Sequence, residues 1–166
     1  MQNRFRNGEL VDFAGAIKAG FQNYANFRGT ASRSAFWYWR LFIFIVNLAT
    51  TFLPGVGFVA SLALWLPDLT VSIRRSRDAG FSAWLQLLWL IPTGLFALEW
   101  PSMIRFGSEH PIDFETASNT EIVNTIGPIL LMALPAILAA LVIQLFFFVT
   151  YLLPTKTKEQ GNKYAN

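Results

Sequence analysis

Residues 74–84 have the sequence RRSRDAGFSAW, which places three arginines and an aspartate between two long apolar runs. The runs on either side, residues 57–73 and 83–100, are close to the ~20 residues that a helix needs to cross a bilayer core of about 30 Å. A short charged segment between two such runs is typical of a loop that joins membrane-spanning helices. The stretch therefore predicts a helical hairpin whose turn lies at a membrane surface.

Two further apolar runs occupy residues 36–53, which end at a Pro-Gly turn signal, and residues 123–153. The last run exceeds a straight crossing, so it must tilt or bend, and Pro128 and Pro135 supply the bends. Only 14% of the chain is charged and 54% is hydrophobic, against about 25% charged in a typical soluble domain. We predict an all-α integral membrane protein in which residues 1–166 form a single membrane domain with four transmembrane helices.

The remaining segments are predicted from their polarity. Apolar residues recur at helical spacing over residues 10–28, which predicts an amphipathic interfacial helix that Gly15 and Gly20 would weaken. Residues 101–122 form the predicted extracytoplasmic loop, and residues 154–166 form a polar, flexible cytoplasmic tail. The start of the chain does not resemble a signal peptide.

The distribution of positive charge predicts the orientation. Of the 13 Lys and Arg residues, all but Arg105 lie in the N-terminal 40 residues, in residues 74–77 or in the tail. With four crossings these three regions share one side, and residues 101–122 lie on the other. The positive-inside rule then places both termini and residues 74–84 on the cytoplasmic side of the membrane.

Two ionisable residues fall inside predicted spans. Arg40 lies near the cytoplasmic end of the first span and Asp68 near the cytoplasmic end of the second, so an antiparallel hairpin brings them to the same depth. We predict an intramembrane ion pair between them. Three interpretations remain open: a structural pair, a proton or ion relay, and two side chains that extend separately to the interface.

Signals for catalysis or cofactor binding are weak. The chain has no cysteine and a single histidine, His110, which excludes thiol chemistry and multi-histidine metal sites within one chain. No phosphate-binding glycine loop or nucleophile elbow is present. We predict no catalytic residue, no metal and no cofactor, and the positive charge is explained by topology without nucleic acid.

Three stretches of the chain resemble a known family. Residues 27–42 (FRGTASRSAFWYWRLF), 66–92 (LPDLTVSIRRSRDAGFSAWLQLLWLIP) and 159–166 (EQGNKYAN) are similar to the bacterial inner-membrane proteins of the domain of unknown function 805. The matching positions are Gly29, Ala31, Ser32, Arg33, Ser34, Phe36 and Trp37, and then Arg74, Arg75, Asp78, Gly80, Ser82 and Trp84.

Four positions depart from the family pattern. Thr30 and Ala35 replace its usual Arg and Glu, and Ser76 and Arg77 replace its Leu and His. A pH-sensing role for the missing histidine therefore does not transfer to this chain. The resemblance implies a bacterial inner-membrane protein without a settled activity.

Three functions are compared. The first is a small scaffold or regulatory protein that binds a partner or anionic lipid at a basic cytoplasmic face, formed by Arg33, Arg74, Arg75, Arg77, Asp78 and Trp84. The second is a subunit of an oligomeric transporter or channel for small solutes or ions, with Arg40 and Asp68 lining its path. An enzyme ranks last because no nucleophile and base are paired, so we predict a non-enzyme. The membrane-protein partner and the homo-oligomeric state remain open.

Overall fold

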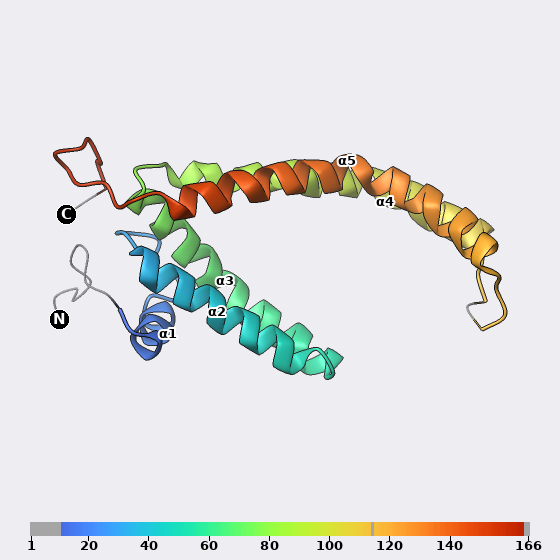
Figure 1. The fold of residues 1–166 in the computed structure, drawn as a ribbon, viewed down its shortest axis with the longest axis horizontal. Coiled ribbons are helices and arrows are strands. Elements are labelled where there is room, and N and C mark those ends of the chain that lie inside the picture. The colour runs from blue at the N-terminus through green and yellow to red at the C-terminus, as the bar shows by residue number, and fades with distance from the viewer. Residues whose placement is uncertain (1–10, 114, 165–166) are drawn as a thin grey trace. The chain divides into compact units, whose positions relative to one another are not determined.

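The structure is a computed structural model that describes residues 11–113 and 115–164, and within these residues it contains helices and turns but no strand. The predicted all-helical class is confirmed. The elements are α1 (Phe13–Gln22), α2 (Arg33–Thr50), α3 (Pro54–Asp78), the 3₁₀ helix η1 (Ala83–Trp89), α4 (Leu90–Glu109) and α5 (Asn119–Leu152) (Figure 1).

The chain divides into two compact units. The first contains α1, α2 and α3 together with the residues that follow α3 up to 85 and the chain from residue 149, and the second contains residues 86–148. In the second unit, the Trp89 ring stacks on the Phe147 ring with centroids 6.3 Å apart. The start of α4 therefore lies beside the end of α5, and residues 110–118 connect the two helices as an antiparallel hairpin (Figure 1).

Three of the described helices are long and apolar enough to cross a membrane: Gly55–Asp78, Ala83–Glu109 and Asn119–Leu152. Only 6% of the most apolar window of the second segment and 17% of that of the third are buried within the protein. Exposing apolar surface to water costs about 25 cal/mol per Å². Long apolar helices that stay unburied within the protein therefore mark surfaces that contact lipid or another protein. The protein is therefore a membrane protein.

The α2 helix does not meet the same criterion of length and composition. Its 18 residues include Arg33, Arg40 and Asn47, which offset the apolar residues of its second half. The sequence predicts four crossings, and the helices of the structure support three by this criterion. The fourth crossing and the orientation of the termini remain predictions.

The connection between α4 and α5 is shorter than the predicted loop of residues 101–122. The α4 helix continues through Pro101 to Glu109, and α5 begins at Asn119. Ser118 and Glu121 form a capping box, since the Ser118 amide donates to the Glu121 carboxylate at 2.8 Å and the Glu121 amide donates to Ser118 Oγ at 3.3 Å. This Ser-x-x-Glu signal is readable in the sequence, but the prediction followed the end of the apolar run instead. The α5 helix continues through Pro128 and Pro135 as a gentle curve (Figure 1).

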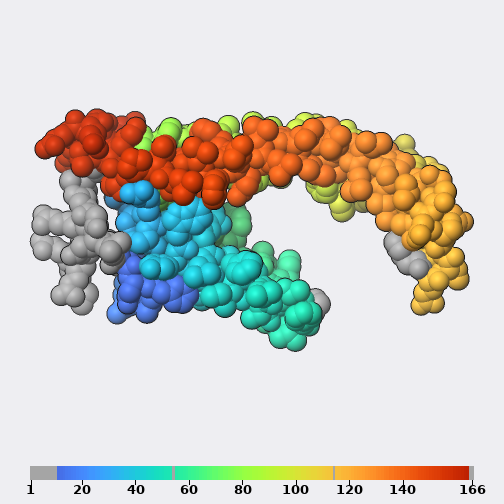
Figure 2. Space-filling view, viewed as in Figure 1, coloured from blue at the N-terminus to red at the C-terminus, as the bar shows by residue number. Residues whose placement is uncertain are grey.

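The first unit is built around α1, which is shorter than the predicted helix of residues 10–28; residue 10 lies outside the described residues. Asp12 caps α1 by accepting from the Gly15 amide at 2.9 Å. The small buried residues Ala16, Ala19 and Gly20 let α1 pack closely against α2 and α3. In the space-filling view α1 and α2 form one continuous surface (Figure 2).

Candidate functional site

The last three turns of α3 are polar and buried. Their buried polar residues are Thr70, Ser72, Arg74, Arg75, Ser76 and Asp78. Buried polar groups are stable only when they are hydrogen-bonded, and here the partners come from two distant parts of the chain. We call this assembly the polar module and define it as residues 12–37, 67–85 and 150–164.

Arg75 joins α3 to the end of α5. Its side chain is fully buried, and its Nε and Nη2 atoms donate to the Tyr151 carbonyl at 3.1 and 2.9 Å. Nη2 also donates to the Leu153 carbonyl. Because α5 ends at Leu152, these carbonyls belong to a helix terminus, where intrahelical partners are missing and a cation is favoured. Arg75 therefore caps α5 from a different helix.

Asp78 completes this contact. Its carboxylate accepts from Arg75 Nη1 and from Thr155 Oγ1, the latter at 2.7 Å. Its backbone carbonyl accepts from the Lys156 amide at 2.9 Å. At Gly80 the chain reverses with φ +88°, a conformation that side chains disfavour, and an added Cβ would lie 3.1 Å from Lys156 Cδ. The chain therefore reverses within the predicted turn of residues 74–84, and the tail packs against this reversal.

The tail is docked as far as residue 164. Asn162 is 3% exposed, and its Nδ2 donates to the carbonyls of Arg77 at 2.9 Å, Lys156 at 3.0 Å and Asp78 at 3.3 Å. The Arg77 guanidinium lies over the Tyr164 ring, 5.3 Å from its centroid. A hydrogen bond with Ser82 lowers the pKa of the Tyr164 phenol. The sequence prediction of a flexible tail is wrong for these residues. It rested on the polar composition of the tail, which does not show that Asn162 is buried and hydrogen-bonded.

Replacing Asn162 with alanine is expected to release residues 155–164. The change leaves three carbonyls without this donor, at a cost of about 1–3 kcal/mol. Limited proteolysis should then cut the tail much faster in the variant than in the parent. Lys158→Ala, at an exposed position of the same segment, is the control, and equal cleavage of both variants would contradict the docking.

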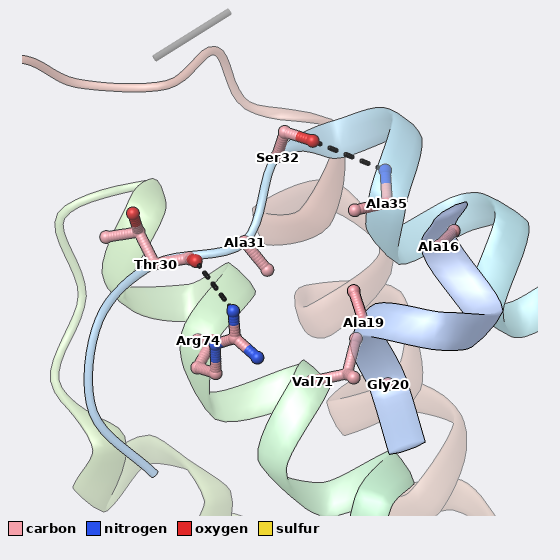
Figure 3. A pocket seen from close by; sticks show the side chains of 9 residues that line it. All are labelled: Ala16, Ala19, Gly20, Thr30, Ala31, Ser32, Ala35, Val71 and Arg74. Carbon is pink, nitrogen blue, oxygen red and sulfur yellow. Dashed lines mark hydrogen bonds between the residues drawn. The ribbon is translucent and has the colours of Figure 1, made fainter. Parts of the chain in front are cut away.

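The segment before α2 is held by the same turns of α3. Arg74 Nη2 donates to the Thr30 carbonyl at 3.3 Å, and the Ala31 amide donates to the Arg74 carbonyl at 3.1 Å (Figure 3). Arg77 Nη1 donates to the Phe27 carbonyl. Ser32 caps α2 by accepting from the Ala35 amide at 3.3 Å (Figure 3). The three stretches that carry the family resemblance thus meet in the polar module.

The six residues of the predicted basic face have different environments. Arg33 and Trp84 are exposed and Arg77 is half-buried, whereas Arg74, Arg75 and Asp78 are buried. Arg75 and Asp78 form hydrogen bonds with each other, with the end of α5 and with the tail. They therefore do not contribute to an exposed face. The exposed cations of the described part of the module are instead Lys18, Arg28, Arg33, Lys156, Lys158 and Lys163. Trp84 lies in the first turn of η1, and its amide donates to Ser82 Oγ at 3.4 Å.

Arg40 and Asp68 form an ion pair between α2 and α3. The distance from Arg40 Nη1 to Asp68 Oδ2 is 3.0 Å, and Arg40 Nη2 donates to Ser72 Oγ at 3.3 Å. The side chains are 39% and 26% exposed within the protein alone. Because the side chains contact each other and Ser72, the geometry agrees with a structural pair, and a relay role remains a prediction.

A double-mutant cycle on this pair is expected to give a coupling energy of about 1 kcal/mol, typical of polar contacts within membranes. Arg40→Gln and Asp68→Asn should each lower the free energy of unfolding in detergent. The exchanged pair Arg40→Asp with Asp68→Arg should recover part of the loss. Equal damage from both single variants and from the exchange would argue against pairing.

Comparison with known proteins agrees with a membrane location. Residues 24–166 match the family described as protein of unknown function, DUF805. The inner membrane protein YhaH of Escherichia coli strain K12 is 35% identical over an alignment that covers 43% of this chain and 69% of that protein. The protein of the same name from E. coli O157:H7 gives the same values. No solved structure matches significantly. The inner-membrane relative and the apolar helices together support an inner-membrane location.

Proposed function

The chain belongs to the DUF805 family of proteins of unknown function, and from this premise we propose that it is a multi-pass membrane scaffold or regulatory protein that binds anionic lipid headgroups. The binding surface is the set of exposed cations of the polar module. This proposal retains the basic face expected from the sequence but assigns different residues to it. Arg75 is buried and is left out, and exposed residues of the tail and of the α1–α2 connection are added.

The charge balance of the polar module carries the proposal. Among its described residues, six exposed Lys and Arg side chains face solvent or headgroups, and the exposed carboxylates are those of Asp12 and Glu159. The carboxylates of Asp68 and Asp78 are paired with Arg40 and Arg75. A basic group near an anionic leaflet contributes about 1 kcal/mol. Six such groups with few opposing charges would favour an anionic membrane surface.

Contacts within the polar module support the placement of its three segments on the same side of the membrane. The Ala31 amide bonds to the Arg74 carbonyl, and the Lys156 amide bonds to the Asp78 carbonyl. The segments around residues 31, 78 and 156 are therefore adjacent whether or not α2 crosses the bilayer. Their positive charge supports a cytoplasmic location for this side, with α2 and α3 as one hairpin and α4 and α5 as another.

The test compares lipid retention in nanodiscs that contain phosphatidylcholine with or without phosphatidylglycerol. Native mass spectrometry counts the lipids that stay with the full-length chain. The triple variant Arg28→Gln, Arg33→Gln, Lys158→Gln should lose about tenfold or more of the preference for phosphatidylglycerol. High salt should reduce the preference of the parent as well.

Arg105→Gln is the matched control, because Arg105 is exposed but lies outside the polar module. This variant should retain the preference of the parent protein. A triple variant that folds and still selects phosphatidylglycerol as the parent does would overturn the proposed function.

A further inference from the structure

A small cavity of about 20 Å³ lies inside the polar module. One wall is formed by the small side chains of α1, the second by residues 30–32 at the start of α2, and the third by α3 with Arg74 (Figure 3). Six of its nine lining residues are Ala, Gly or Val, and the polar groups come from Thr30, Ser32 and Arg74. A cavity of this volume holds about one water-sized group. It is therefore large enough for a single oxygen atom of a ligand whose remainder lies outside.

Arg74 brings an uncompensated charge to this cavity. The residue is 8% exposed, its Nη2 donates to the Thr30 carbonyl, and its buried Nε has no hydrogen-bond partner. Two other arginines of α2 and α3, Arg40 and Arg75, are paired with carboxylates. Across residues 11–113 and 115–164, no Asp or Glu forms such a pair with Arg74. A buried cation without a counter-charge is costly, so the site favours an anion.

The start of α2 adds positive potential at the same place. Ser32, the N-cap of α2, lines the cavity. The first amides of a helix lack intrahelical partners and carry the positive end of the helix dipole. Anionic oxygens bind at such ends, and Arg guanidinium groups bind phosphate oxygens with charge-assisted hydrogen bonds. A buried guanidinium and a helix terminus thus converge on one water-sized space.

We propose that this cavity is a phosphate subsite that takes one oxygen of a phosphate group, held by Arg74 and by the start of α2. The inference rests on the proposed function, because the phosphate of an anionic lipid headgroup is one source of the ligand. A free phosphate ion is the other source. Exposed cations attract the anionic surface, and the subsite gives a fixed point of contact within it.

The experiment uses the full-length protein and has two arms. In the first, inorganic phosphate is titrated by calorimetry into protein in phosphatidylcholine nanodiscs. In the second, native mass spectrometry measures retained phosphatidylglycerol. Arg74→Gln should weaken binding about tenfold or more. Arg74→Lys should weaken it less, because lysine keeps the positive charge but cannot form the paired hydrogen bonds of a guanidinium group. Arg105→Gln removes an equal charge from an exposed position outside the polar module and should leave binding unchanged.

The outcomes separate the two sources and the two proposals. Arg74-dependent phosphate binding identifies a free anion as a sufficient ligand, and Arg74-dependent retention of phosphatidylglycerol alone identifies the headgroup. If Arg74→Gln binds both ligands as well as Arg105→Gln does, the subsite is overturned and the proposed function stays intact. If the parent binds neither ligand, both proposals fail. If Arg74→Gln does not fold, Ala35→Val provides the test instead. The larger side chain fills the cavity and leaves Arg74 in place, so it must abolish binding if the subsite exists.

Discussion

Replacing Arg75 with methionine is expected to lower the free energy of unfolding by about 3–5 kcal/mol, the range for a broken buried ion pair. The loss arises because Asp78 would remain buried without its cation, while the carbonyls of Tyr151 and Leu153 would lose their donors. Denaturant titration in detergent, followed by circular dichroism, measures the change. The end of α5 and the tail should also exchange amide hydrogens faster.

Two companion variants make this expectation specific. Arg33→Met removes an exposed arginine and should change stability by no more than about 0.5 kcal/mol. Arg75→Lys keeps the charge but cannot reach two carbonyls and a carboxylate at once, so its loss should be intermediate. If Arg75→Met and Arg33→Met unfold alike, Arg75 does not cap α5.

The features that the sequence predicted correctly are local. Long apolar runs predict the helices α3, α4 and α5 because the length of a crossing is set by the bilayer. The turn predicted for residues 74–84 is present, and the chain reverses there at Gly80, whose φ of +88° suits a glycine. The meeting of Arg40 with Asp68 follows from equal depth in a hairpin, and the ion pair is present at 3.0 Å.

The features that the sequence did not predict depend on distant contacts. Arg74, Arg75 and Arg77 look alike within a charged loop, yet Arg75 is buried because Tyr151, 76 positions later, accepts its hydrogen bonds. Asn162 bonds to carbonyls 84 and 85 positions earlier. Composition cannot reveal such partners, so the charged loop resembled a free surface and the tail resembled a flexible one.

Gly20→Ala is expected to lower stability by about 1–2 kcal/mol and to loosen α1, although the same change stabilises most helices. An added Cβ would lie 2.2 and 2.3 Å from two ring atoms of Trp39. That ring is fully buried and also contacts the rings of Phe21 and Phe42, with centroids 5.5 and 5.4 Å away. Because the ring cannot move aside, α1 must shift, and overpacking of this kind costs about 1–3 kcal/mol.

Gly94→Ala is the matched control, since Gly94 is helical and a Cβ there meets nothing within 4 Å. Helix propensity alone would raise stability by up to about 1 kcal/mol in both variants, so the two changes should have opposite signs. Hydrogen exchange of residues 13–22 should accelerate in Gly20→Ala and stay unchanged in Gly94→Ala. Equal stabilisation by both would mean that Gly20 is only a weak point of an interfacial helix, as its composition suggests. Opposite signs would show that Gly20 is the contact through which α1 is held on Trp39 of α2.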